Sequence, residues 1–197
     1  YRPGQIYVWD GNGTVQWTKG LSVPVNGISI SPEGRYVAVA ADRVYLFLRQ
    51  GAEKWSRNTG YFAYSVAVSA NGNRVAAGFD DGSIQVFDQE GREIARYAAE
   101  GNVISTAISE NGSYVAGGSD DRAIYFLDSK GRLLWKRVTG GSVAGVAMSA
   151  DGSLVGAGST DRVAYFFDRE GALLWKYAAS RRISSVSISP EGNLAAV

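Results

Sequence analysis

The chain has 197 residues, of which 45% are hydrophobic and 20% are charged, and its formal net charge is +1. This composition is enough for a buried core and argues against disorder, while the near-neutral charge gives no general attraction to nucleic acid or to an anionic membrane. Cysteine and histidine are both absent, which excludes disulfides, thiolate metal sites and the commonest general base, and no apolar run is long enough for insertion into a bilayer.

A four-residue motif, in which a serine and a glycine flank two other residues, recurs along the whole chain. It occupies residues 31–34, 69–72, 109–112, 149–152 and 189–192, at steps of 38, 40, 40 and 40 residues. A second glycine follows in four of the units, and a tryptophan lies four residues after it in three of them; these pairs are Gly51 and Trp55, Gly131 and Trp135, and Gly171 and Trp175, with Ala95 as the exception after Gly91. Gly13 and Trp17 fit the same frame. The spacing predicts an array of repeated structural units.

Each unit is predicted to contain four short strands. In the fourth unit these are residues 144–149 before the motif, 154–158 after it, 164–167, and 173–176 with the tryptophan. The segments are rich in β-branched and aromatic residues and are separated by glycine, aspartate, asparagine and serine, which favour tight turns. No segment has the 3.6-residue periodicity of a helix over ten residues or more. The sequence therefore predicts an all-β fold of antiparallel strands.

The distribution of side-chain size within a unit selects one all-β architecture. In the first strand, large residues such as Val66 and Val68 alternate with small ones such as Ser65 and Ala67. The third strands are apolar on both sides, whereas the fourth mix tryptophan with lysine and arginine, as a protected outer edge would. A small inner strand, a charged outer strand and two buried faces predict sheets arranged radially, as in a five-bladed β-propeller with four antiparallel strands per blade.

Two stretches resemble known propeller repeats. Residues 149–168, "SADGSLVGAGSTDRVAYFFD", resemble a WD-repeat blade, and Trp9-Asp10 is the dipeptide that names that family. Residues 168–175, "DREGALLW", resemble the quinoprotein-type repeat. The chain lacks the glycine-histidine pair of typical WD repeats, so the histidine-centred hydrogen-bond network of that family cannot form. The resemblance implies a WD-repeat-like or quinoprotein-like propeller, and no set of residues matches the calcium site and base of a quinoprotein dehydrogenase.

The repeat frame predicts one domain over residues 1–197. Its units are residues 25–63, 64–102, 103–142, 143–182, and a last unit in which residues 183–197 combine with 1–24. In this arrangement the N- and C-terminal segments share one blade and close a five-bladed ring, and we expect a monomer. The alternative is that the chain is an excerpt of a larger ring.

Catalysis is not expected. A glycosidase of this fold would need a pair of carboxylates near the axis, one to protonate the leaving oxygen and one to attack or to activate water. The five predicted inner strands contain no aspartate, glutamate, histidine, lysine or arginine. Residues 10–14 and 79–83 carry the oxygens of a calcium loop but no terminal bidentate acid, and both lie where hairpin turns are expected. We predict no catalytic residue, no cofactor and no metal site.

Binding is expected on the face formed by the turn after each second strand and the loop after each fourth strand, because the units differ most there. Aromatic and arginine side chains are enriched at binding hot spots. The candidate residues are Tyr61, Phe62, Tyr64, Arg122, Arg137, Arg162, Arg181, Arg182, Asp81 and Asp121. The hypothesis is a noncatalytic scaffold that binds a protein or a peptide. The alternatives are a carbohydrate or small ligand bound between blades, an excised or engineered propeller without activity, and aromatic residues that only fill a gap between blades.

Overall fold

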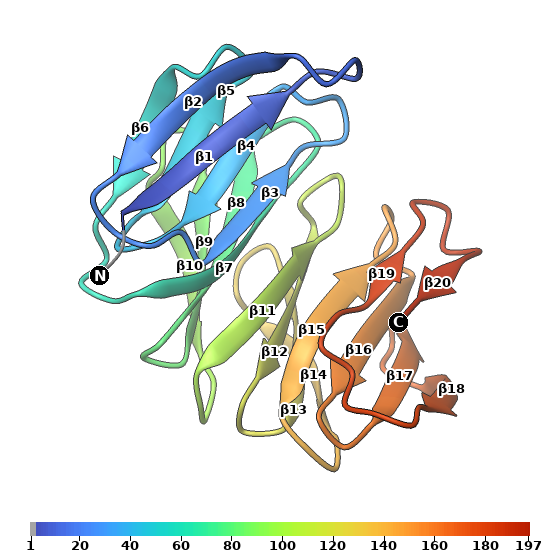
Figure 1. The fold of residues 1–197 in the computed structure, drawn as a ribbon. Coiled ribbons are helices and arrows are strands. Elements are labelled where there is room, and N and C mark those ends of the chain that lie inside the picture. Colours follow the sequence, from blue (N-terminus) through green and yellow to red (C-terminus); the bar gives the residue numbers. More distant parts are fainter. Residues whose placement is uncertain (1–2) are drawn as a thin grey trace.

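A computed structural model describes residues 3–197, and these residues form β-strands joined by turns and loops (Figure 1). The strands make four antiparallel sheets of four and two antiparallel sheets of two. Every four-stranded sheet follows the chain order, so each is a simple meander. This confirms the all-β repeat of four-stranded units that the motif spacing predicts.

The strand bounds follow the repeat. The first two-stranded sheet contains β1 (Gly4–Trp9) and β2 (Val15–Leu21). The four-stranded sheets are β3 (Gly27–Ile30), β4 (Tyr36–Ala40), β5 (Val44–Leu48), β6 (Glu53–Arg57); β7 (Ala63–Val68), β8 (Arg74–Phe79), β9 (Ser83–Asp88), β10 (Glu93–Ala98); β11 (Val103–Ile108), β12 (Tyr114–Ser119), β13 (Ala123–Asp128), β14 (Leu133–Val138); and β15 (Val143–Met148), β16 (Leu154–Ser159), β17 (Val163–Asp168), β18 (Leu173–Ala178). The last two-stranded sheet contains β19 (Ser187–Ile188) and β20 (Ala195–Ala196).

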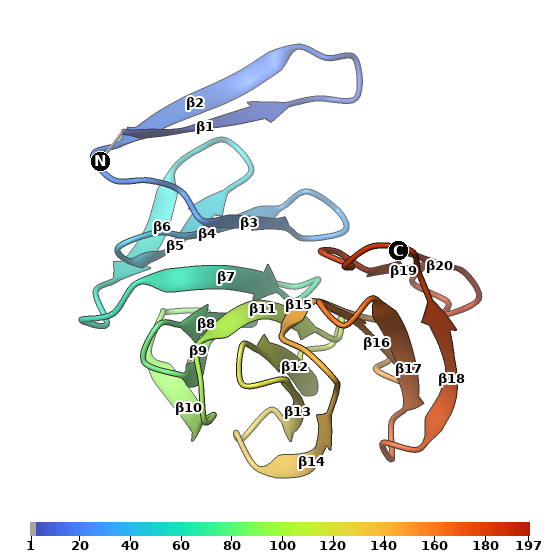
Figure 2. The ribbon, with the colours of Figure 1, turned by 60° about the horizontal axis from the view of Figure 1, so that its bottom comes forward.

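The first strands of successive sheets lie side by side. β3 contacts β7, β7 contacts β11, β11 contacts β15, and β15 contacts β19. Figure 2 shows the remaining strands of the sheets β7–β10, β11–β14 and β15–β18 fanning outward from this inner row. This radial arrangement of meander sheets is that of propeller blades, and we refer to the sheets as blades.

The repeated serine-glycine motif forms the turn between the first and second strands. In the third blade, Ser109 Oγ accepts a hydrogen bond from Tyr114 N at 3.0 Å and donates one to Asn111 Oδ1 at 2.8 Å. Gly112 has a φ of 72°, a left-handed conformation that glycine adopts without steric cost. The motif recurs because one turn geometry needs a hydroxyl at its start and a glycine at its end.

The hydrophobic core is divided among the spaces between neighbouring blades. Val66 and Val68 on β7 pack against Ala38 and Leu46 of the preceding blade, as the large side of the inner strand was expected to do. Corresponding clusters lie between the second and third blades and between the third and fourth. Each blade therefore depends on its neighbours for burial, as in other repeat proteins.

In three of the repeat units, a tryptophan on the outer strand packs on the next blade. A Cβ added to Gly171, whose φ is 81°, would lie 2.7 Å from Trp135 Cγ, so the indole packs directly on the glycine. Trp135 Nε1 also donates to the Arg169 carbonyl at 2.9 Å, and its ring lies 5.5 Å from that of Phe167. Trp17 packs on Gly51 and donates to the Arg49 carbonyl in the same way, and Trp55 packs on Gly91. The three tryptophans therefore have the same packing role between neighbouring units.

Trp175 differs from its counterparts because no blade follows it on that side in the described chain. Its side chain is 47% exposed, against 6% for Trp55 and 6% for Trp135. The chain ends form the separate sheets β1–β2 and β19–β20, which do not pair with each other within residues 3–197. The predicted shared blade, the number of blades and the closure of the ring therefore stay predictions. The described residues contain no helix long and apolar enough to cross a membrane.

Candidate functional site

The loop face is the end of the blades at which each second strand turns into the third and each fourth strand leads to the next blade. Its turns are residues 41–43, 80–82, 120–122 and 160–162, and its loops are residues 22–26, 58–62, 99–102, 139–142 and 179–186. All ten sequence-predicted candidates come from these segments or from the strands beside them. The structure separates them into groups with different roles.

The aspartates of the third and fourth turns hold the loops in place. Asp121 Oδ1 accepts from Ala123 N at 2.8 Å, and its Oδ2 accepts from the Tyr125 hydroxyl at 2.6 Å and from Glu100 N at 3.1 Å. Asp161 repeats the arrangement, with Gly140 N at 2.7 Å and the Tyr165 hydroxyl at 2.8 Å from Oδ2. These carboxylates join a turn, a third strand and the preceding loop, so their oxygens are already in use.

The electrostatic effect of this network is visible in Asp161. Burial alone would raise the pKa of its carboxyl, but the hydrogen bonds from Tyr165, Val163 and Gly140 outweigh it and hold the pKa below its ordinary value. Asp81, in the second turn, accepts hydrogen bonds from Ser83 N at 2.9 Å and Ser83 Oγ at 2.6 Å and pairs with Arg96 at 3.5 Å. The carboxylates of the candidates Asp81 and Asp121 are therefore both paired with groups of the chain itself.

Asp42, in the first turn, does not follow this pattern. Three residues separate the paired Ala40 and Val44, whereas five separate the corresponding pair Gly78 and Ile84 in the next blade. The Tyr45 hydroxyl donates to Asp42 Oδ1 at 3.1 Å, but among residues 3–197 no loop amide donates to this carboxylate. Burial, with Asp42 as the next cause, raises the pKa of Tyr45 to about 12, so the hydroxyl remains a donor to Asp42 at neutral pH.

The aromatic candidates gather beside this turn. Tyr61 and Phe62 are in the loop after β6, Tyr64 is on β7, and the three side chains are 44%, 47% and 36% exposed. The loop itself is well held, because Phe62 N donates to Asp80 Oδ1 at 3.0 Å and Asp80 N donates to the Phe62 carbonyl at 3.1 Å. A held backbone with exposed aromatic side chains is a preorganised contact surface.

Two shallow hollows flank Phe62. One has a volume of about 280 Å³ and is lined by Asp42, Asn58, Gly60, Tyr61 and Phe62. The other has a volume of about 200 Å³ and is lined by Pro24, Asn26, Phe62 and Tyr64. The first combines a carboxylate with aromatic rings, and the second is bounded mainly by ring carbons. Sequence reasoning identified the aromatic residues but not Asp42 or Pro24.

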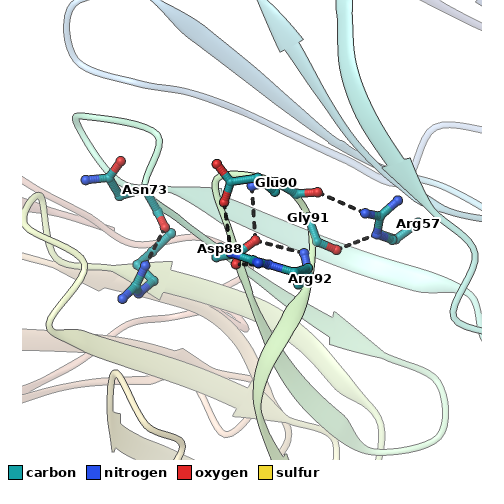
Figure 3. Close-up of polar contacts among 7 residues, drawn as sticks. Arg57, Asn73, Asp88, Glu90, Gly91 and Arg92 are labelled. Atoms are coloured by element: carbon teal, nitrogen blue, oxygen red, sulfur yellow. Dashed lines mark hydrogen bonds and ion pairs between the residues drawn. The ribbon is translucent and has the colours of Figure 1, made fainter.

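The candidate Arg137 lies between two blades. Its Nε donates to the Gly171 carbonyl at 2.8 Å, and its Nη1 donates to the Lys136 carbonyl at 2.9 Å. Arg57 makes the same link two interfaces earlier, donating from Nε to the Gly91 carbonyl and from Nη2 to the Glu90 carbonyl at 2.9 Å, as Figure 3 shows. Two arginines separated by two full repeats thus bind equivalent backbone oxygens, which assigns both a structural role.

The other four arginine candidates are exposed. Arg122 and Arg162 have φ values of 74° in their turns, and their carbonyls accept bonds from Thr139 N and Ala179 N. Arg181 and Arg182 line a separate hollow of about 400 Å³ with Tyr177 and Val197, next to the uncovered strand β18. Within residues 3–197, the hollow lined by Arg181 and Arg182 is separate from the one lined by Tyr61, so the loop face has an aromatic part and a basic part.

The chemistry of the inner strands differs from that of the loop face. The inner strands β3, β7, β11, β15 and β19 carry no aspartate, glutamate, lysine or arginine, and no group of three or more acidic residues in the described chain could hold a metal ion. What the loop face does provide is exposed rings, a carboxylate and hollows on a rigid frame. Exposed aromatic rings on a rigid frame are typical of binding interfaces.

Comparison with known proteins identifies the repeat. The family model PQQ_2, described as outer membrane protein assembly factor BamB, matches residues 1–114 and again residues 80–197, so the two matches together span the whole chain. The search of curated proteins found no significant sequence match to this chain. The match supports the quinoprotein-like part of the predicted resemblance, and the WD-like part stays a prediction. The blades share the packing of a tryptophan on a glycine, as Trp135 packs on Gly171. Because the family model matches the whole chain, the chain belongs to the PQQ_2 family of quinoprotein-like repeat proteins.

Proposed function

We propose that the chain is a noncatalytic propeller module that binds a protein or a peptide through the aromatic part of its loop face. The observation that carries the proposal is the group Tyr61, Phe62 and Tyr64, which is exposed on a loop whose backbone is fixed by Asp80. Large aromatic side chains on a held backbone lose little conformational freedom on binding, and they dominate the energetics of many interfaces.

The size of the hollows favours a peptide over an enclosed small ligand. At about 200 and 280 Å³, the two hollows beside Phe62 are smaller than typical small-molecule pockets of about 300–1,000 Å³. Two neighbouring hollows of this size match two side chains of one extended segment. The family is also described by a protein-assembly factor, which agrees with a role in contacts between proteins.

Selection from a displayed library of short random peptides tests the proposal. We expect the enriched peptides to bind the unchanged chain and to bind the double variant Tyr61→Ser/Phe62→Ser at least about tenfold more weakly, because two central aromatic contacts are removed. The matched control is Ile94→Ser/Leu134→Ser, which removes two similarly exposed apolar side chains from outer strands. Equal affinity of the enriched peptides for the unchanged chain and the Tyr61/Phe62 variant, with both proteins folded, would contradict the proposal.

The proposal for the architecture is a five-bladed ring in which β19–β20 supply the inner strands and β1–β2 the outer strands of one shared blade. Each half is already attached to the neighbour that this ring requires. Ile6 and Leu21 of the β1–β2 sheet pack on Val37 and Phe47 of the first blade. Val186 and Ile188 pack on the fourth blade in the way that Val146 and Met148 pack on the third.

The surfaces left uncovered at the two ends are complementary in the repeat frame. Trp175 stacks on Phe166 of its own blade but contacts no glycine or aromatic ring of a following blade, as Trp135 does. Trp9 and the turn at Gly13, which occupy the positions of that ring and glycine, have no tryptophan packed on them within the described residues. Trp9 is 55% exposed, and a Cβ added to Gly13 would meet nothing within 4 Å. Ile28 and Ile30, whose counterparts Val66 and Val68 are buried, are exposed where the shared blade would lie. Closure would bury all these groups together, which makes it favourable by the hydrophobic effect.

A further inference from the structure

We propose that the hollow beside Asp42 binds a positively charged side chain, with arginine preferred, presented by the peptide or protein partner. The inference rests on the proposed function and specifies the chemistry of the partner. It comes from a comparison of equivalent turns. Asp42 accepts no hydrogen bond from a loop amide among the described residues, and it lines a hollow together with two exposed aromatic rings.

The equivalent aspartates show what Asp42 lacks. In the third and fourth blades, Oδ2 of Asp121 and Asp161 accepts both a tyrosine hydroxyl and a loop amide, from Glu100 or Gly140. In the first blade, Tyr45 supplies the hydroxyl, but among the described residues no amide of the preceding loop, residues 22–26, donates to Asp42. One side of the Asp42 carboxylate is therefore available to a donor from outside the chain.

The neighbouring positive charge is weakly held. Arg43 Nε lies 3.9 Å from Asp42 Oδ2, and the two side chains are 44% and 36% exposed. An exposed pair at this distance contributes little, so a better placed cation can replace it. Arg96, which is also on this side, is occupied by Glu93 at 3.0 Å and by Asp81 at 3.5 Å.

The rings of the hollow complete a site for a cation. Tyr61 and Phe62 provide two aromatic faces next to the carboxylate, and a guanidinium can stack on a ring while it donates to a carboxylate. The volume of about 280 Å³ is suited to a single side chain. On the other side of Phe62, the hollow formed with Pro24 and Tyr64 offers an apolar position for an adjacent residue of the same partner.

Titration of the ¹⁵N-labelled chain with N-acetyl-arginine methylamide, followed by amide chemical shifts, tests the inference without a known partner. We expect the shifts to concentrate on residues 58–62 and on Asp42. The citrulline derivative, which has the same shape without the charge, is expected to cause much smaller shifts. Asp42→Asn is expected to weaken binding of the arginine probe about fivefold.

The matched control is Glu33→Gln, which removes an exposed carboxylate from a turn at the opposite end of the blades and should bind the probe as the unchanged chain does. Equal shifts with arginine and citrulline, an unchanged affinity of Asp42→Asn, or shifts confined to residues 179–186 would each overturn the inference. The outcomes are separate from those of the peptide selection. Enriched peptides without a required cation would leave the proposed function in place and refute this inference, whereas probe binding without enriched peptides would refute the function alone.

Discussion

Replacing Trp135 with alanine is expected to lower the free energy of unfolding by about 3–5 kcal/mol. The indole is 6% exposed and lies between two blades, where it contacts Gly171 and Phe167 and donates a hydrogen bond to the Arg169 carbonyl. Its removal leaves a cavity and an unpaired carbonyl at an interface on which both blades depend. Urea unfolding at equilibrium, monitored by circular dichroism, measures the change.

The control for Trp135→Ala is Leu134→Ala on the same strand. Leu134 is 39% exposed, so its replacement is expected to cost about 1 kcal/mol or less. Similar losses for the two variants would mean that the tryptophan does not carry the contact between the blades.

Replacing Gly171 with valine is expected to destabilise the same interface from the other side, by about 3–5 kcal/mol. Two effects combine: a β-branched residue is strained at a φ of 81°, and its Cβ would lie 2.7 Å from Trp135 Cγ. The indole would have to move out of the space between the blades. Thermal and urea unfolding of the variant measure the loss.

Gly60→Val separates the two effects. Gly60 also has a φ of 81°, but a Cβ added there would meet nothing within 4 Å. We therefore expect only the backbone strain, about 1–2 kcal/mol. If both valine variants lose the same stability, the contact with Trp135 is not the reason that glycine occupies position 171.

Most of the fold could be predicted because each type of turn requires particular residues, and these residues recur in the sequence at a constant spacing. The serine-glycine motif marks the first turn, and the glycine at positions such as 131 and 171 marks the turn on which a tryptophan or its replacement packs. The exception at Ala95 is consistent with this contact, since the built Cβ of Gly131 would lie 3.0 Å from the Ala95 Cβ. The joining of the chain ends depends on contacts over the whole length of the chain, which no local pattern specifies.

The candidate site was only partly predictable for a different reason. Exposure of Tyr61, Phe62 and Tyr64 follows from their position in a loop, but the use of a polar side chain depends on what lies within its reach. Arg137 reaches the next blade and Asp121 reaches the preceding loop, which the sequence does not show directly. The sequence nevertheless contains two indications of these roles. Arg57 and Arg137 are separated by two repeats, and the first step of 38 residues instead of 40 indicates the shortened turn that contains Asp42.

The five-bladed ring is tested most directly by a disulfide between its two ends. By analogy with Ala116 opposite Phe126 in the third blade, closure places Ala196 opposite Val8. Opposed residues of antiparallel strands have Cα atoms about 4.5–5.5 Å apart, which suits a disulfide. The chain has no cysteine of its own, so the variant Val8→Cys/Ala196→Cys contains a single possible pair.

Mild oxidation of this variant, followed by intact mass and non-reducing electrophoresis, gives the result. A closed ring predicts a bridge within one chain at every protein concentration. The control Val15→Cys/Ala196→Cys should stay reduced, because Val15 is on the next strand and outside the reach of a disulfide. Free thiols in the Val8/Ala196 variant, or bridges formed only between chains, would contradict the closed five-bladed ring.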